Sequence, residues 1–407
     1  MRILVHPHAM EVGGSQINAV ELAAAVRDRG HEVLVYGPDG VLVDTVRELG
    51  LEMVLAPPRR ATPSPASARA LVRLVRERGI DLVHAYEWNA TLDTMAGPGW
   101  LLGTPVLSTI LSMDVPHFLP RTVPMVVGTR QMQVAELRWR PEVHLMEPPI
   151  DTGANAPGAV PDADVRAVRT RWGIGADEAL VVVVGRIAPE LKLEGLLGAC
   201  DATALLDPAL RVRLLVVGDG PSRALVAERA AKVNADLGRE AVVLTGTIDD
   251  PRPVYAAADV VLGMGGSALR GMAFARPLIV QGEDGFWSAL SPDSLPGFLE
   301  NGWYGRGDGA PGGPRLAALL TKALQDPQGS AARGALGRQV VVERFSLTAA
   351  AEHLETIYRS VAARAVPATA RGAQAARTTV TVAKHRLAVR AERGLAVARA
   401  RAGWVPS

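Results

Sequence analysis

The chain has 407 residues, of which 48% are apolar and 21% are charged. This length exceeds one ordinary hydrophobic core and favours two domains or more. Aromatic residues make up only 4%, which argues against binding single-stranded nucleic acid by base stacking. The single cysteine, Cys200, excludes an internal disulfide framework and a cysteine-based zinc site, so we expect the reducing cytoplasm.

The charge is distributed unevenly. From Arg364 onward nine Lys or Arg residues stand against one acid, Glu392, while the rest of the chain carries a net charge of −6. The body therefore gives no reason to expect a nucleic-acid partner. The first residues, MRILVHPHAM, lack the basic and long apolar segments of an export signal, and nowhere do eighteen apolar residues stand together. We expect neither a signal peptide nor a membrane span.

The N-terminal third alternates short apolar runs with amphipathic stretches, as repeated strand–helix units do. RILVH from Arg2 predicts the first strand, and a helix with Ser15 as its N-cap follows Gly13 and Gly14 until Gly30 ends it. The later predicted elements are HEVLVYG from His31, MVLA near Val54, a helix over 67–78, DLVHAY from Asp81, TPVLSTI from Thr104 and PMVVGT from Pro124.

The second half repeats this pattern after a stretch rich in small residues and proline. We predict a first domain at 1–150, a linker at 151–164 and a second domain at 165–345. Its strands are expected in ALVVVVG from Ala179, LLVVGDGP from Leu214, AVVLTGT from Ala241 and PLIVQG from Pro277, with a small-residue helix in GSALRGMAFA. A helix at 346–363 is expected to pack back on the body, followed by a basic Ala/Arg-rich tail at 364–407. The predicted fold class is α/β, with two doubly wound Rossmann-like domains facing a central cleft, plus C-terminal helices.

The sequence VVVVGRIAPELK, residues 181–192, carries the most functional information. Four valines predict a strand buried on both faces, and Arg186 and Lys192 follow its carboxyl end, where open α/β sheets bind ligands. The pair predicts an anionic ligand, most simply a diphosphate. The alternative is that both are solvated surface cations.

Six motifs in order resemble a retaining glycosyltransferase of family 4 with the two-domain GT-B fold, over about residues 1–360. They are GGSQ at Gly13, PPID at Pro148, GRIAPELK at Gly185, LLVVGDGP at Leu214, VVLTGTIDD at Val242 and YAAADVVL at Tyr255. The resemblance implies a nucleotide-diphosphate-sugar donor on the C-terminal domain, an acceptor on the N-terminal domain, and retention of anomeric configuration. It implies no bound metal and no other cofactor.

The resemblance assigns Arg186 and Lys192 to the donor diphosphate. Two glycine-led helix starts supply further N–H groups for an anion or a sugar hydroxyl. They are Gly13–Gly14, for which a tight turn is the alternative, and Gly265, Gly266 and Ser267. Gly246, Thr247 and Ile248 match the segment that lodges the nucleotide base, which backbone groups would contact.

Two departures from the family concern the sugar and ribose contacts. Relatives carry two glutamates eight positions apart, whereas this chain has Leu262 and Arg270 there. Leucine offers no acceptor and arginine only donors, although Arg270 still belongs to the ribose end of the predicted site. We hypothesise that Glu283 and Asp284 in QGEDGFW supply the missing donor contacts.

A third departure concerns the catalytic histidine that relatives often carry after the strand matching TPVLSTI. That position is Leu111 here, so Ser112, Asp114 and His117 become the candidate catalytic residues, with a plain surface role as the alternative for His117. Gln16, His84 and Glu87 are the further candidates for acceptor or sugar contacts, and loop packing is the alternative for the last two.

Several functions stay open at this stage. The first alternative is an active transferase with rearranged contacts or an unusual donor. The second is a non-catalytic protein that keeps the fold and binds a nucleotide sugar or a partner. An epimerase-type enzyme is a further alternative, but it would need clear acid/base groups. The acceptor is a small molecule, a glycan or a lipid-linked sugar. The tail is either a basic helix in peripheral contact with an anionic membrane or a solvated, partly disordered end.

Overall fold

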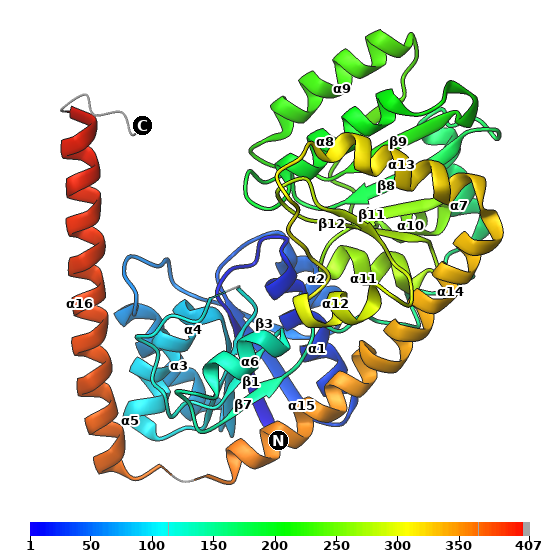
Figure 1. The fold of residues 1–407 in the computed structure, drawn as a ribbon. Coiled ribbons are helices and arrows are strands. Elements are labelled where there is room, and N and C mark those ends of the chain that lie inside the picture. The colour runs from blue at the N-terminus through cyan, green and yellow to red at the C-terminus, as the bar shows by residue number, and fades with distance from the viewer. Residues whose placement is uncertain (113, 365, 402–407) are drawn as a thin grey trace. The chain divides into compact units, whose positions relative to one another are not determined.

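The computed structural model describes residues 1–112, 114–364 and 366–401, which divide into two compact units (Figure 1). The N-terminal unit contains residues 1–128 and 132–146 together with the chain from 351 onward. The C-terminal unit contains residues 129–131 and 147–350. The main chain therefore passes into the C-terminal unit near residue 146 and returns at residue 351.

The N-terminal unit contains a seven-stranded parallel sheet in the order β3-β2-β1-β4-β5-β6-β7. The bounds are β1 Arg2–Pro7, β2 Glu32–Gly37, β3 Glu52–Leu55, β4 Leu82–Tyr86, β5 Val106–Ile110, β6 Met125–Val127 and β7 Val143–Leu145. In register, Val5 of β1 lies between Val35 and His84 of its neighbours. Because the central strands are buried on both faces, their sequences read as near-continuous apolar runs.

The helices of this unit begin and end at residues with the expected backbone preferences. Ser64 caps α3 by accepting a hydrogen bond from the Ser67 N–H, and Gly79 ends the helix in a left-handed conformation. The prediction that Ser15 caps the first helix is wrong, because α1 has Gly13 in that position and Ser15 lies inside the helix. The helices are α1 Gly14–Asp28, α2 Leu42–Glu48, α3 Pro65–Arg78, α4 Glu87–Thr94, α5 Trp100–Leu102 and α6 Arg130–Glu136.

The C-terminal unit contains a six-stranded sheet in the order β10-β9-β8-β11-β12-β13. Five strands are parallel, as predicted, but β13 pairs antiparallel with β12 at the edge. The strands are β8 Ala179–Val184, β9 Val212–Val217, β10 Val242–Gly246, β11 Val260–Gly263, β12 Leu278–Gln281 and β13 Trp287–Ala289. The helices are α7 Asp162–Arg171, α8 Leu193–Leu205, α9 Arg223–Leu237, α10 Arg252–Ala257, α11 Gly266–Ala273, α12 Leu295–Asn301, α13 Gly312–Gln325 and α14 Pro327–Arg344.

Two apolar layers cover this second sheet. Leu180 and Val182 of β8 pack in a cluster with α10, α11 and α14, whereas Val181 and Val183 pack in a cluster with α8, α9 and α13. The alternation follows from the two-residue period of a strand. Both units thus have the doubly wound parallel architecture, which confirms the predicted fold class.

The C-terminal helices return to the N-terminal unit. Helix α15 (Leu347–Ala362) contributes Glu355, which pairs with Arg29 at 2.7 Å and His31 at 3.1 Å. Helix α16 (Ala368–Arg401) follows, and Gln374 on it accepts a hydrogen bond from the Trp100 indole at 3.0 Å. The structure describes residues 368–401 of the predicted tail as a helix. No helix in the described ranges is long and apolar enough to cross a membrane.

Candidate functional site

The predicted cations gather at the carboxyl edge of the second sheet. Strand β8 ends at Val184, and the exposed Arg186 follows in the next turn. Lys192 precedes α8. Its Nζ lies 3.8 Å from the point that a Cβ on Gly185 would occupy. The ammonium group therefore lies directly beyond the end of β8, as the motif predicts.

Lys192 is a half-buried cation. Burial lowers the pKa of its ammonium group from 10.5 to about 8. No carboxylate in the described part of the chain forms an ion pair with it, and Arg186 likewise has no ion pair there. An unpaired charge held away from water costs free energy, which an anionic ligand beside it would offset.

Two glycine-containing loops hold this edge together. A Cβ on Gly218 would overlap the carbonyl oxygen of Gly185, and one on Gly220 would overlap that of Ile187. The Ile187 N–H donates to the Asp219 carbonyl at 2.9 Å, which joins the loop after β8 to the loop after β9. The glycines of LLVVGDGP thus allow the close approach of two backbones.

The loop after β10 joins the same edge. Gly246 has a φ of 74°, and its carbonyl accepts a hydrogen bond from the Gly218 N–H at 2.9 Å. Thr247 is exposed and Ile248 is half-buried beside it. The three residues predicted to lodge the base therefore lie next to the loop that fixes Gly185.

The start of α11 has the predicted small residues. Gly265 has a φ of 51°, and no atom lies within 4 Å of the space that its Cβ would fill. The Ser267 hydroxyl is already used, because it donates to the Met264 carbonyl at 2.9 Å. The guanidinium of Arg270 lies 3.6 Å from the Cβ position of Gly266, so these two residues share one face of the helix.

Leu262 makes no contact with solvent or ligand space. It belongs to β11, it is 0% exposed, and it packs in the core cluster with Val181 and Ile279. Leu262, predicted to stand at a glutamate position of the family, is therefore a core side chain.

Glu283 and Asp284 lie in the loop after β12. The Glu283 carboxylate accepts hydrogen bonds from Tyr304 and Arg306, and the bond from Tyr304 contributes most to lowering its pKa. Asp284 Oδ2 lies 3.5 Å from the Arg306 guanidinium. The N–H groups of Asp284 and Gly285 donate to Glu194 in the first turn of α8, so this loop is tied to the segment that carries Lys192.

In the N-terminal unit Glu87 organises the carboxyl edge of the first sheet. It follows β4, is only 6% exposed, and accepts hydrogen bonds from the Ser15 hydroxyl and from the N–H groups of Leu111 and Ser112. Its second oxygen accepts from the Ser112 hydroxyl at 2.7 Å. These bonds bring together Glu87, a predicted acceptor or sugar contact, Ser112, a candidate catalytic residue, and the helix start at Gly13–Gly14.

The prediction that His84 contacts an acceptor is wrong. His84 lies inside β4, is 1% exposed, and forms hydrogen bonds to the hydroxyls of Tyr358 (2.7 Å) and Thr109 (2.6 Å). Burial lowers the pKa of His84 to about 3, so the ring is neutral. Its role is to join α15 to the centre of the sheet.

The three candidate catalytic residues do not form an acid/base group. Ser112 donates to Glu87, and Asp114 contributes only its backbone carbonyl, 3.4 Å from the Ser112 hydroxyl. The His117 ring lies edge-on to Phe118 and to His385 of α16, with centroids 6.1 and 6.0 Å away. His117 therefore faces the C-terminal helix.

The sequence analysis missed His8, which directly follows β1. It is half-buried, burial lowers its pKa, and its Nδ1 is buried without a hydrogen-bond partner among the described residues. Its Nε2 lies 3.4 Å from the Gln16 amide nitrogen, and the charge of Glu87 acts on it. The signal that singled out Arg186, a polar residue just beyond a buried strand, applies to His8 as well.

A buried ion pair lies near this edge. Asp93 is 0% exposed, pairs with Arg59 at 2.9 Å, and has its pKa raised by burial to about 6.

Within the described ranges no group of three His, Cys, Asp or Glu side chains is arranged to hold a metal ion.

Two family models match the chain. Residues 12–147 match Glycosyltransferase Family 4, and residues 178–299 match Glycosyl transferases group 1. The chain is also similar to two curated relatives named D-inositol 3-phosphate glycosyltransferase. The one from Segniliparus rotundus is 27% identical over 69% of this chain and 66% of its own length. The one from Thermobispora bispora is 26% identical over 87% of this chain and 91% of its own.

Solved structures share the fold. The Anabaena Alr3699/HepE complex with UDP covers 88% of this chain and 100% of its own, with a TM-score of 0.68 and 18% identity. A glycosyltransferase from Rickettsia africae covers 89% of this chain and 99% of its own, with a TM-score of 0.72 and 14% identity. A putative UDP-N-acetylglucosamine 2-epimerase from Listeria monocytogenes covers 88% of this chain and 96% of its own, with a TM-score of 0.60 and 11% identity.

Proposed function

Because this chain is a family-4-like glycosyltransferase with the GT-B fold, we propose that it transfers a sugar from a nucleoside-diphosphate donor and retains the anomeric configuration. The observation that carries the donor proposal is the position of Lys192, a half-buried ammonium without an anionic partner in the described chain, just beyond the carboxyl end of β8. A diphosphate provides the missing negative charge.

The chemistry assigns a role to each cation. When the bond between the anomeric carbon and the phosphate oxygen opens, negative charge grows on the diphosphate, and preorganised donors stabilise it best where water is excluded. Arg186 is able to engage two oxygens at once, whereas Lys192 acts as a point charge. We propose that these cations, with the N–H groups at Gly265 and Gly266, neutralise the leaving group without a metal ion.

The nucleotide is the next element of the proposal. The solved complexes of Alr3699/HepE with UDP and with UDP-glucose make a uridine nucleotide the first donor to test. Gly246, Thr247 and Ile248 are the proposed base contacts, and Arg270 the ribose-end contact. Since relatives' glutamates are replaced, Glu283 and Asp284 remain our candidates for the sugar, supported by the ties between their loop and the start of α8.

On the N-terminal unit we propose that the acceptor binds at the edge that Glu87 organises. His8 Nδ1 has no hydrogen-bond partner there among the described residues, and the Gln16 amide lies 3.4 Å from His8 Nε2 at the start of α1. Epimerisation is not favoured, because the two family models and both curated relatives are glycosyltransferases.

Calorimetric titration of the protein with UDP, GDP and ADP tests the donor site. Arg186→Ala is expected to weaken binding of the preferred nucleotide by about 2–5 kcal/mol, since it removes one partner of a charged, desolvated contact. Arg166→Ala is the matched control, because Arg166 is an exposed residue of α7 in the same unit. The titration is repeated with EDTA, which should not change the affinity.

Binding of no nucleotide, or equal losses in both variants, would refute the donor site. Slow hydrolysis of the matching nucleotide sugar, followed by proton NMR of the released sugar, then tests retention. Release of the inverted anomer would contradict that part of the proposal alone.

A further inference from the structure

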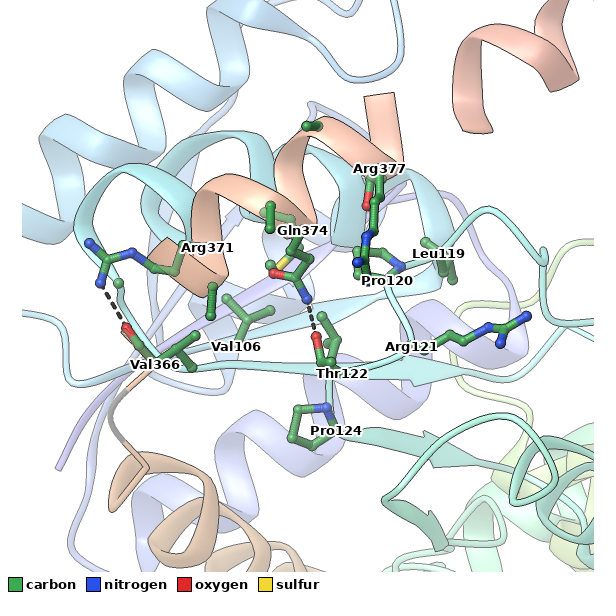
Figure 2. Close-up of a pocket in the computed structure, with 18 of the residues that line it drawn as sticks. Val106, Leu119, Pro120, Arg121, Thr122, Pro124, Val366, Arg371, Gln374 and Arg377 are labelled. Atoms are coloured by element: carbon green, nitrogen blue, oxygen red, sulfur yellow. Dashed lines mark hydrogen bonds between the residues drawn. The ribbon is translucent and has the colours of Figure 1, made fainter. Parts of the chain in front are cut away.

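A pocket of about 1110 Å³ lies between α16 and the rest of the N-terminal unit (Figure 2). One wall is the segment 117–124, which follows β5, together with the residues that precede β5. The other wall is the first part of α16. Figure 2 shows Gln374 on the helix with its amide directed at Thr122, to which it donates a hydrogen bond.

The interior of the pocket is apolar. Val106, Phe118, Leu119 and Val123 line it from the body, and Ala373 is among the small residues that line it from the helix. Pockets of about 300–1,000 Å³ enclose most of a ligand of drug size, so this one is large enough for a substantial hydrocarbon group. The alanines among the lining residues of the helix, Ala370, Ala373 and Ala376, have short side chains that leave space in the pocket.

The charged residues of the lining are all basic. Among the described residues that line the pocket there are four arginines and no Asp or Glu; the arginines are Arg121, Arg364, Arg371 and Arg377. Arg364 pairs with Glu142. No carboxylate in the described chain pairs with the other three.

Arg371 is the most informative of these cations. Its terminal nitrogen donates to the Val366 carbonyl at 3.1 Å, but its Nε is buried and has no hydrogen-bond partner within the described ranges. Arg377 lies six residues further along the same helix, about 9 Å in rise, with Gln374 between them (Figure 2). An apolar interior bordered by unpaired guanidinium groups is complementary to an amphiphile with an anionic head.

The pocket and the edge organised by Glu87 share no residue, because neither Glu87 nor Ser112 lines the pocket. The pocket extends from Thr104, Pro105 and Val106 at the amino end of β5 to His117, which follows the carboxyl end of that strand.

We propose that this pocket binds a hydrocarbon chain of an anionic lipid, with the head-group phosphate held by Arg371 and Arg377. The site docks the N-terminal unit on an anionic membrane by taking one lipid hydrocarbon chain into the pocket. This contact adds to the general attraction between the basic helix and the anionic surface. This inference does not depend on the proposed transfer reaction.

Two assays with the full chain test the proposal: calorimetric titration with laurate, and flotation with phosphatidylcholine vesicles with and without phosphatidylglycerol. Arg371→Gln combined with Arg377→Gln is expected to weaken laurate binding about tenfold or more, because two cations near the head group are lost. The control is Lys384→Gln combined with Arg386→Gln, which removes the same charge from exposed positions of α16 outside the pocket.

A second variant tests the apolar interior. Ala373→Trp fills the pocket and should abolish laurate binding, whereas Ala383→Trp, an exposed site of the same helix outside the pocket, should not. Circular dichroism verifies that each variant keeps its helix content. Dodecyltrimethylammonium, which has a hydrocarbon chain but a cationic head, should bind weakly.

Three results would overturn the proposal. They are equal loss of vesicle flotation in both double variants, laurate binding that survives Ala373→Trp, and equally tight binding of the cationic amphiphile. The first would reduce the membrane contact to unspecific attraction of a basic helix. Loss of laurate binding and of flotation in the pocket variants, with the controls unchanged, supports it.

Discussion

The carboxylate of Glu87 holds Ser112 by two hydrogen bonds, from the backbone N–H at 3.1 Å and from the hydroxyl at 2.7 Å. Glu87 follows β4 and Ser112 follows β5. Glu87 therefore orients the loop that follows the neighbouring strand. Glu87 has a φ of 69°, a left-handed conformation that costs free energy for a residue with a side chain. The hydrogen bonds to its carboxylate offset that cost.

Glu87→Ala should destabilise the N-terminal unit by about 1–3 kcal/mol, because it keeps the unfavourable φ and removes the acceptor of the donors on Ser15, Leu111 and Ser112. Amide hydrogen exchange at Leu111 and Ser112 should accelerate with it. Glu77→Ala is the control, since Glu77 forms only an exposed pair with Arg73 on α3 and should change stability little. Unchanged exchange at Leu111 and Ser112 would show that Glu87 does not orient this loop.

The depressed pKa of Lys192 predicts a pH dependence of nucleotide binding. The charged form binds the diphosphate, so affinity should be greatest below pH 8 and should fall as the pH rises through the pKa of about 8. A diphosphate is fully ionised above about pH 7, so its own titration does not contribute. Calorimetry between pH 7 and 9.5 measures the effect.

Lys192→Arg provides the control for this pH dependence, because arginine stays charged throughout the range. Its affinity should be flat where that of the parent falls. Lys192→Met should bind nucleotide poorly at every pH. Its free energy of unfolding should nevertheless be higher by about 1 kcal/mol or more, since a half-buried charge is removed. A parallel fall in the Arg variant would assign the titration to another group.

Gly218→Ala should weaken nucleotide binding although Gly218 carries no side chain for a ligand. Its Cβ would overlap the Gly185 carbonyl, and the loop that carries Arg186 would have to shift. A loss of about tenfold in affinity is expected, because small displacements of a charged contact are costly. Gly297→Ala, in α12, has open space around its Cβ and should leave affinity unchanged.

His84 and Tyr358 should contribute to stability and not to catalysis. His84→Phe leaves the hydroxyls of Tyr358 and Thr109 without their partner, at a cost of about 1–3 kcal/mol. Tyr358→Phe should cost less in the His84→Phe background than in the parent, which thermal unfolding of the four proteins measures. A change in kcat of the folded His84→Phe variant would restore a catalytic role for this histidine.

Local sequence patterns were a reliable guide to the elements and to one end of the site. Strand β8 and the position of the cations after it follow directly from VVVVGRIAPELK. Leu262, which counting along the sequence places at a glutamate position of the family, lies buried in the core on β11. The same reasoning failed for His84, because Asp81–Tyr86 contains no local signal that separates a histidine inside the strand from one at its end. His8 also stands just beyond a buried strand, but no local pattern separates a functional histidine at that position from a structural one.

The sequence by itself determined the two mainly parallel sheets, their helices and the place of Arg186 and Lys192 beyond β8, since apolar period, glycine position and strand length depend on residues close together in the chain. Only the tertiary structure decided which polar groups meet. Glu87 collects donors from two other segments, and Trp100 meets Gln374 across 274 residues. Such contacts depend on which distant segments the folded backbone brings side by side, and the burial of His84 and the pocket beneath α16 have the same origin.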